Sequence, residues 1–215
     1  YAGAAGGYID SYGFPFCRGR VFDHVEEDCG QYNDSAEVFW ASGACVLIRM
    51  TAFNKAGGFD GDFFAHMEEI DLCWRMKLLG YSIKFAPDSV VYHIGGGTLS
   101  KYNPRKTYLN FRNNLSMLFK NVPAHDLFPV IFIRLLMDGI AGLFFFIKGN
   151  FSGMFAVMKS HYSFYLNIPC LTNKRKKIIR LNGMLYPGGI LRGNVVFEYF
   201  IRGHKRFTDL TGKIR

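Results

Sequence analysis

The sequence predicts an α/β domain over residues 1–120 and a basic, aromatic-rich helical tail over residues 121–215. Two observations predict this division. In the first part, short apolar runs that are typical of strands alternate with runs of helical period. The charge also changes along the chain, because residues 1–119 hold 11 bases and 13 acids whereas residues 120–215 hold 15 bases and 4 acids. Such asymmetry is typical of a protein that binds a polyanion, either a nucleic acid or an anionic membrane.

The first elements follow from local composition. Residues 1–35 are rich in Gly, Tyr and Asp, and they predict irregular loop with a short helix near residues 23–28. The apolar run 44–48 predicts a buried strand. We expect a short helix at residues 52–56, which Gly57 would end in a left-handed conformation.

The middle of the chain predicts helix and strand in turn. Residues 67–79 repeat apolar side chains at helical spacing, and Gly80 stands where such a helix would stop. Residues 81–85 and 90–92 predict short strands, and residues 108–119 predict another helix.

The most apolar segment, residues 127–147, is long enough to span a bilayer. Arg134 and Asp138 lie in its middle, however, where each charge costs about 2.5–3.5 kcal/mol on membrane-insertion scales. Their spacing places both charges on one helix face. We favour a helix that lies in the membrane interface, apolar side down. A core helix with an internal ion pair and a membrane-spanning helix are the alternatives.

The basic run at residues 173–177 stands beside aromatic and aliphatic residues and predicts contact with anionic lipid head groups. A solvated basic loop is the alternative. We do not expect a nucleic-acid partner, because no recognised binding motif accompanies the charge.

Cysteine usage predicts a reducing compartment. The five cysteines are an odd number, widely spaced, and contain no Cys-x-x-Cys motif, which argues against a disulfide framework or a structural zinc site. The chain begins at Tyr1 without a recognisable signal peptide, so nothing in it indicates secretion.

The most informative feature is a cluster of acids at the start of the predicted helix. It consists of three carboxylates within four positions, Glu68, Glu69 and Asp71. A glycine turn at residues 57–60 precedes it, and His93 follows it, just before the glycines at 95–97. This grouping predicts a site that handles a proton or a cation. The alternative is that the acids only stabilise the positive end of a helix, at about 0.3–1 kcal/mol each.

In this order, the motifs resemble the second half of the catalytic domain of family 2 glycosyltransferases, which are inverting, nucleotide-sugar-dependent enzymes with a GT-A fold. The resemblance covers about residues 36–120. The matching residues are Trp40-Ala-Ser-Gly-Ala44, Arg49, Gly57-Gly-Phe-Asp60, Glu68-Glu-Ile-Asp71, Leu72-Cys-Trp-Arg75, Gly80-Tyr81, Pro87 and His93. Glu69 departs from the pattern, since the family usually has an aspartate there, and its longer side chain changes where the carboxylate oxygens lie.

The resemblance implies a partial GT-A domain and a set of site residues. Glu69 would be the general base, while Glu68 and Asp71 would hold the base, the acceptor or the loop. His93 would be a ligand of a divalent cation, Mn²⁺ or Mg²⁺, that binds the leaving diphosphate. The implied substrate contacts are Trp40, Ser42, Gly43, Gly58, Asp60 and Arg75. Trp40 is equally compatible with a core position.

The resemblance also implies the reaction and its place. We expect transfer of a sugar from a nucleotide-diphosphate sugar to a glycan or lipid-linked acceptor in cell-surface polysaccharide synthesis. The expected location is the cytoplasmic face of the bacterial inner membrane, with peripheral or monotopic attachment. A non-catalytic membrane-docking or scaffold module is the alternative.

The donor-binding half of a GT-A enzyme is not evident in the sequence. Asp60-Gly-Asp62 has the letters of an Asp-x-Asp motif, but it lies in the glycine turn and not after an apolar strand. We therefore expect the chain to be the C-terminal part of a longer transferase, with little or no activity when isolated.

Overall fold

The computed structural model describes residues 5–92, 103–182 and 187–214, and it confirms a mixed α/β structure. The described residues divide into two compact units, which are treated separately below. The sheet unit is drawn from residues 1–59, 69–93 and 185–215. The helical unit is drawn from residues 60–68 and 94–184.

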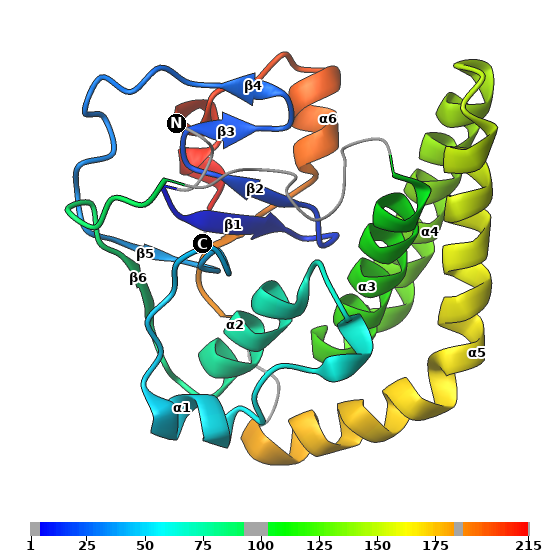
Figure 1. Ribbon diagram of the computed structural model, residues 1–215, viewed down its shortest axis with the longest axis horizontal. Coiled ribbons are helices and arrows are strands. Elements are labelled where there is room, and N and C mark those ends of the chain that lie inside the picture. The colour runs from blue at the N-terminus through cyan, green and yellow to red at the C-terminus, as the bar shows by residue number, and fades with distance from the viewer. Residues whose placement is uncertain (1–4, 93–102, 183–186, 215) are drawn as a thin grey trace. The chain divides into compact units, whose positions relative to one another are not determined.

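In the described part of the sheet unit, five strands form one sheet in the order β4-β3-β2-β1-β7 (Figure 1). They are β1 (Gly7–Asp10), β2 (Pro15–Cys17), β3 (Arg20–Val21), β4 (His24–Val25) and β7 (Ile190–Leu191). Neighbouring strands are antiparallel except β1 and β7, which are parallel. A separate antiparallel pair joins β5 (Ala36–Val38) to β6 (Ile83–Phe85).

The prediction of irregular loop and a short helix in residues 1–35 was wrong, because this segment supplies four of the strands. Its strands are only two to four residues long, so they carry too few positions to show a period. Residues 187–214, which the sequence placed in the tail, belong to the sheet unit through β7.

Asp10 joins the two ends of the sheet unit. Its side chain is buried, and its Oδ1 accepts hydrogen bonds from the backbone amides of Tyr12 (2.9 Å) and Phe14 (2.8 Å). Its Oδ2 accepts from the amide of Val195 (2.9 Å), the first residue of α6 (Val195–Phe200). Three amide donors satisfy a carboxylate that would otherwise be costly to bury. The short 3₁₀ helices η2 (Phe207–Asp209) and η3 (Thr211–Lys213) follow α6.

The two helices expected at residues 52–56 and 67–79 are present as α1 (Met50–Lys55) and α2 (Glu68–Leu78). Gly57 and Gly80 both have a φ of 83°, so both helices are followed by a left-handed glycine as predicted. Ala52 and Ala56 pack with Leu72 and Met76 in one buried cluster, which holds the two helices together.

Two predicted strands are absent from the described residues. In the segment 44–48, the amide of Ala44 bonds to Ser42 Oγ (3.2 Å), and the resulting turn leaves Leu47 fully exposed. Residues 90–92 are also exposed and have no strand partner among the described residues. Both runs are apolar, but a strand needs an edge to pair with, and β6 pairs with β5 instead.

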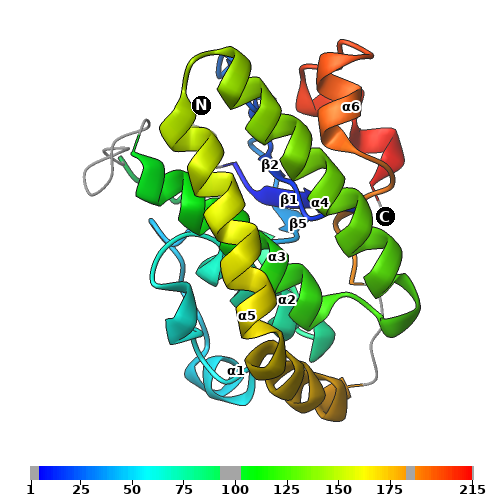
Figure 2. The ribbon, with the colours of Figure 1, turned by 90° about the vertical axis from the view of Figure 1, so that its right-hand side faces the viewer.

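The helical unit consists of a short 3₁₀ turn η1 (Gly61–Phe63) and the long helices α3 (Pro104–Asn121), α4 (Ala124–Ile147) and α5 (Phe151–Asn182). α5 packs against both α3 and α4, which also contact each other (Figure 2). Asn103 begins α3 by accepting a hydrogen bond from the amide of Arg105 (2.9 Å), with Pro104 at the first helical position. A buried core cluster of the helical unit consists of Leu115, Phe164 and Leu171.

Helix α4 buries its charges. Its buried residues are Arg134, Asp138 and Gly142, whereas most of its large apolar side chains are exposed. Arg134 donates to Asp138 Oδ1 (2.7 Å) and to Asn114 Oδ1 of α3 (2.5 Å). The buried ion pair agrees with the alternative of a core helix. The exposed apolar face does not agree with it. α4 is long and apolar enough to cross a membrane, although length and composition alone do not establish a span.

The buried pair in α4 gives a stability prediction. Asp138→Ala leaves Arg134 uncompensated in the interior, so we expect the free energy of unfolding to fall by about 3–5 kcal/mol. Replacing both residues by leucine removes both charges and is expected to cost much less. Chemical denaturation of the two variants measures the difference. A double variant less stable than Asp138→Ala would contradict this account.

Candidate active site

The predicted base lies in the first turn of α2, where the sequence placed it. Glu69 is half-buried, and a Cβ built on Gly43 would lie 4.0 Å from the Glu69 Cβ, so the small-residue loop passes beside this carboxylate. Burial raises the pKa of the Cys17 thiol to about 12 and that of Cys73 to about 11, and the charge of Glu69 adds to both shifts. Both thiols therefore stay protonated at neutral pH and do not act as nucleophiles beside Glu69.

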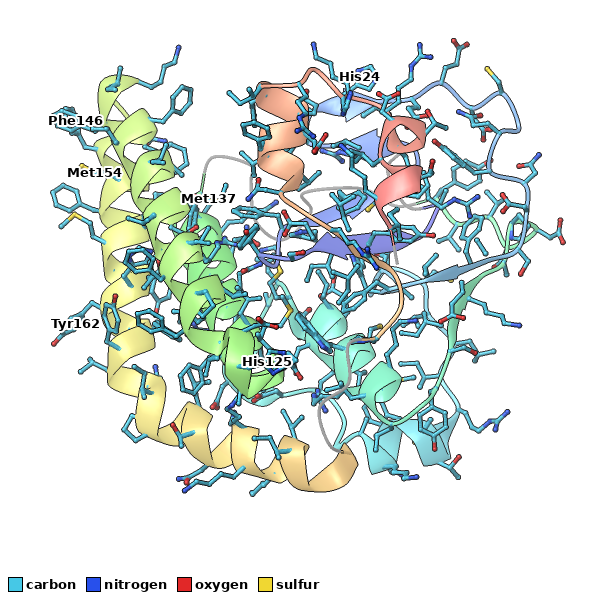
Figure 3. The ribbon with its side chains drawn as sticks, turned by 180° about the vertical axis from the view of Figure 1, so that it is seen from behind. His24, His125, Met137, Phe146, Met154 and Tyr162 are labelled. Atoms are coloured by element: carbon cyan, nitrogen blue, oxygen red, sulfur yellow. The ribbon has the colours of Figure 1, made fainter. Side chains whose placement is uncertain are left out.

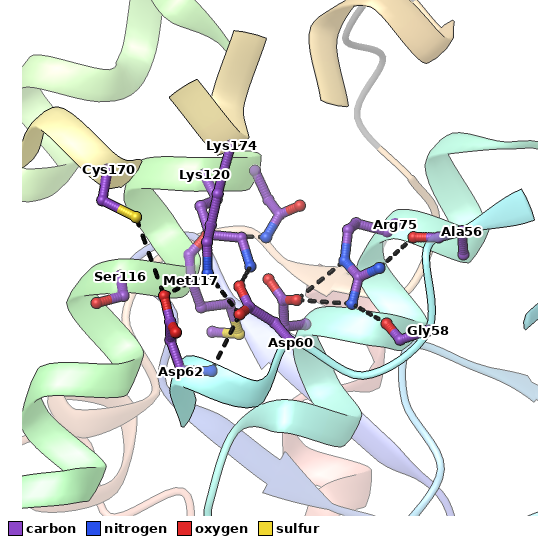
Figure 4. A network of polar contacts seen from close by, with 12 residues as sticks. Ala56, Gly58, Asp60, Asp62, Arg75, Ser116, Met117, Lys120, Cys170 and Lys174 are labelled. Carbon is purple, nitrogen blue, oxygen red and sulfur yellow. Dashed lines mark hydrogen bonds and ion pairs between the residues drawn. The ribbon is translucent and has the colours of Figure 1, made fainter. Parts of the chain in front are cut away.

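Asp71 and Arg75 hold the glycine turn. Asp71 is fully buried, and Arg75 Nε donates to its Oδ2 at 2.9 Å. The two terminal nitrogens of Arg75 donate to the carbonyls of Ala56 and of Gly58, the latter at 2.8 Å (Figure 4). Gly58 has a φ of 65°, and a Cβ there would lie 3.2 Å from the Phe53 ring, so glycine is required. Asp71 was expected to hold the base, the acceptor or the loop, and this geometry matches the last of these roles.

The loop before α2 adopts a strained backbone. Three residues that are not glycine have positive φ angles, namely Phe64 (63°), His66 (69°) and Met67 (72°). Each such conformation costs about 1–3 kcal/mol and persists only where the surroundings impose it. Strain of this kind concentrates at functional sites, and here it directly precedes the acid cluster.

Two side chains from α3 impose that conformation. The amide nitrogen of Asn113 lies 2.8–2.9 Å from the carbonyl oxygens of Phe63, Ala65 and His66. Arg112 donates to the carbonyls of Asp62 (2.8 Å) and Phe63 (3.2 Å). Asn113 is buried, so water does not compete for these bonds. We call this set of contacts the Asn113 clamp.

Glu68 and His66 lie at the end of the clamped loop. Burial lowers the pKa of His66, and Lys106 lowers it further, while the charge of Glu68 opposes them. His66 is therefore neutral at pH 7. Glu68 Oε2 and His66 Nε2 are both buried and have no hydrogen-bond partner within the part of the chain that is described. Buried polar atoms in this state are available to a ligand.

Asp60 lies in the helical unit and is held by two lysines. Its Oδ2 bonds to Lys120 (2.6 Å), and its Oδ1 bonds to Lys174 (2.5 Å) and to the amide of Asp62 (3.2 Å) (Figure 4). Burial alone would raise the pKa of Asp60, but Lys120 and Lys174 outweigh it and hold the value at about 2. Both oxygens are thus engaged, although the sequence predicted a substrate contact here.

A polar pocket of about 260 Å³ adjoins this cluster. It is lined by Asp60, Asp62, Phe63, Arg112, Asn113, Ser116, Asn167, Cys170, Leu171 and Lys174. Of the predicted site residues that the structure describes, only Asp60 lines this pocket.

Trp40 and Ser42 have local structural partners. The indole nitrogen of Trp40 donates to the carbonyl of Tyr8 (2.9 Å), and its ring packs on the buried core of the sheet unit. This position agrees with the core alternative for Trp40. Ser42 closes the turn that carries Gly43 past Glu69. Substrate contact by these residues stays a prediction.

The described residues do not by themselves supply a site for the expected divalent cation. They contain no group of three or more His, Cys, Asp or Glu side chains that could hold a metal ion. Asp60 and Asp71 are already bound to Lys and Arg side chains. The predicted ligand His93 and the glycines at 95–97 lie outside the described residues.

Comparison with known proteins decides the family. The family described as "Glycosyl transferase family group 2" matches residues 17–173, well over half of the sequence. The chain belongs to this family. The glycosyltransferase motifs identified in the sequence all fall inside the matched range.

Curated relatives of this glycosyltransferase chain match over a shorter segment. It is 41% identical over 56 residues to N-acetylglucosaminyl-diphospho-decaprenol L-rhamnosyltransferase from two strains of Mycobacterium tuberculosis, CDC 1551 / Oshkosh and ATCC 25618 / H37Rv. It is 38% identical over 56 residues to rhamnosyltransferase WbbL from Escherichia coli (strain K12). The segment is 26% of this chain, 18% of the mycobacterial proteins and 21% of WbbL. No solved structure matches the chain.

Sequence reasoning missed the residues that hold Asp60 and the loop before α2. Asn113 and Lys120 lie on the predicted helix 108–119 or just beyond it, and their partners are a backbone loop and Asp60. Lys174 was assigned to a lipid-binding run, yet it bonds to Asp60 and Asp62. The available signal was a group of polar residues on the buried side of α3.

The Asn113 clamp gives a second stability prediction. Asn113→Ala removes the side-chain donor from the carbonyls of Ala65 and His66, so we expect a loss of about 1–3 kcal/mol in the free energy of unfolding. Asn110→Ala on the same helix is the matched control and should change stability far less. Urea denaturation compares the two variants, and equal effects would show that the clamp contributes nothing particular.

The low pKa of Asp60 predicts how stability depends on pH. Because this pKa is about 2 in the folded chain and 3.8 ordinarily, the charge of Asp60 stabilises the folded state fully above pH 4. This contribution, about 2 kcal/mol, is lost as the pH falls from 4 towards 2. The stability difference between the parent protein and Asp60→Asn should shrink over that range. The exposed Asp88→Asn should show no such change, and parallel profiles for all three proteins would contradict the assignment.

Proposed function

We propose that this chain carries the acceptor side and the general base of an inverting glycosyltransferase, and that Glu69 is the base. The family match supports sugar transfer. The single observation that supports Glu69 is its position, since it is half-buried in the first turn of α2 beside the loop at Gly43.

The proposed step is a single displacement at the anomeric carbon of the donor sugar. The acceptor hydroxyl oxygen attacks that carbon from the face opposite the nucleoside diphosphate, which leaves with the electrons of the broken bond. The Glu69 carboxylate takes the hydroxyl proton as the new bond forms. A carboxylate suits this role because it is ionised at neutral pH and reaches a hydroxyl at hydrogen-bond distance. Glu68, with a buried oxygen at the same helix end, would orient the acceptor.

The divalent cation remains part of the proposal through His93 alone. When bound, it would supply positive charge to the phosphate oxygens of the leaving diphosphate. The described carboxylates Asp60 and Asp71 would not hold it, because basic side chains already neutralise them. We assign it no further role.

We further propose that the acceptor is lipid-linked and that the enzyme works at the cytoplasmic face of a bacterial inner membrane in cell-surface polysaccharide synthesis. The names of the mycobacterial relatives support a lipid-linked acceptor, because they specify a sugar carried on diphospho-decaprenol. The match covers less than a quarter of each relative, so the donor sugar is left open.

Glu69→Gln in the full-length protein tests the proposed base. The substitution keeps the shape of the side chain and removes its ability to take a proton, so we expect kcat to fall about 10²–10⁴-fold. The exposed Glu27→Gln is the matched control and should retain the parent rate. Turnover of a nucleotide sugar and circular dichroism are measured on both variants.

The same experiment separates the enzyme from the scaffold alternative. A Glu69→Gln protein that is folded and fully active would mean that the acid only stabilises the end of a helix. Glu69→Asp restores the residue usual in the family and should keep much of the rate, since the carboxylate is retained.

A further inference from the structure

Helix α4 buries its charged residues and exposes its apolar ones, which is the reverse of a helix on the surface of a water-soluble protein. Its buried line is Arg134, Asp138 and Gly142, spaced four residues apart, so the charges face inward. The exposed large apolar residues are Phe128, Phe132, Leu136, Ile140, Leu143, Phe144, Phe146 and Ile147. In water such a helix would turn its apolar stripe inward and its charges outward. The surroundings that match this arrangement are apolar.

The exposed apolar surface continues onto the first half of α5. Its members there are Phe151, Phe155, Met158, Tyr162, Tyr165 and Leu166. Figure 3 shows Phe146, Met154 and Tyr162 projecting outward from the hairpin of α4 and α5. We call these exposed side chains of α4 and α5 the α4–α5 face. A contiguous apolar surface on a soluble protein marks an interaction site.

A groove runs between the two helices within this face. It has a volume of about 420 Å³ and is lined by Gly139, Gly142, Leu143, Phe146, Met154, Val157, Met158 and His161. The lining is apolar apart from His161, whose Nε2 lies 3.5 Å from Asp138 Oδ2. The only polar side chain of the groove thus meets the buried pair. A hydrocarbon chain can enter the rest without covering an unsatisfied polar group.

The two charges that oppose membrane burial in the sequence are neutralised inside the unit. Arg134 and Asp138 are 4% and 1% exposed and bond to each other, and Arg134 also bonds to Asn114 of α3. Ionisable residues within membranes face the interior of the helix bundle and pair there, and this pair does both. From Leu127 to Ile147, no exposed residue of α4 carries a charge.

Exposed lysines lie near both ends of α5. Lys148 is exposed in the turn between the helices, and Lys176 and Lys177 are exposed near the other end of α5. Residues 120–215 together hold 15 bases and 4 acids. Basic residues beside an apolar surface complement the anionic head groups of a lipid membrane. A protein partner would have to offer an equally large apolar surface, which is rare on soluble proteins.

We propose that the α4–α5 face enters the hydrocarbon of an anionic lipid membrane, with the Arg134–Asp138 pair turned towards α3. The inference refines the membrane location proposed above by naming the surface that makes the contact. It does not depend on Glu69, so loss of activity in Glu69→Gln leaves it unchanged, and failure of membrane insertion leaves the role of Glu69 unchanged.

Tryptophan fluorescence on the whole chain tests the proposal. Phe144→Trp places a new indole in the α4–α5 face, and Leu47→Trp places one at an exposed apolar position of the sheet unit. Both are mixed with phosphatidylglycerol vesicles whose acyl chains carry bromine, which quenches an indole only at close range. The added emission of Phe144→Trp should be quenched, and that of Leu47→Trp should not.

Binding measurements complete the test. Flotation with phosphatidylglycerol vesicles should recover the parent protein, and binding to neutral phosphatidylcholine vesicles should be at least about tenfold weaker. Leu143→Ser/Phe144→Ser should weaken binding, whereas Val90→Ser/Val91→Ser, which removes exposed apolar area from the sheet unit, should not. Circular dichroism confirms that both double variants are folded. Absence of vesicle binding, or binding without quenching of Phe144→Trp, would overturn the proposal.

Discussion

The Asn113 clamp is the contact on which the loop before α2 depends. One buried amide nitrogen lies against three backbone carbonyls and holds a loop in which Phe64, His66 and Met67 all have positive φ angles. Without compensation these conformations would cost several kcal/mol together. The clamped residues lead directly into the first turn of α2, so the clamp fixes where that helix begins. The placement of Glu68 therefore follows from a residue that need not touch a substrate.

Buried charges in this chain mainly hold backbone, and this changes how its motif residues are interpreted. Arg75 and Asp71 together fix the carbonyls of Ala56 and Gly58, and Asp10 takes amides from the start and the end of the sheet unit. A charged residue in a motif is thus not necessarily in contact with a ligand. A variant of Asp71 or Arg75 is expected to lose activity through the glycine turn, whereas one of Glu69 acts on the proton transfer itself.

Sequence patterns were sufficient where the signal is local. Helical spacing and a terminal glycine located α2, and the same reasoning found α3 and the acid cluster. The sequence did not predict strands β1 to β4, because they are too short to show a period. It did not predict β7, because that strand pairs with β1 across about 180 residues. The apolar runs 44–48 and 90–92 were assigned to strands, but a run of apolar residues does not specify a partner. The polar residues of α3 do not reveal the partners of the Asn113 clamp, since its acceptors are carbonyls that every residue carries.

The same limit explains why residues 127–147 could not be assigned from sequence alone. On membrane-insertion scales, Arg134 and Asp138 each cost about 2.5–3.5 kcal/mol, and each large apolar residue contributes about 0.3–0.6 kcal/mol in favour of insertion, so the sum lies near zero. That sum assumes that each charged side chain is exposed to lipid without a partner. In the structure the two charges bond to each other and Arg134 also bonds to Asn114, so part of the penalty is met inside the helical unit. The remaining exposed side chains of α4 are mostly apolar, which supports the proposed contact with lipid.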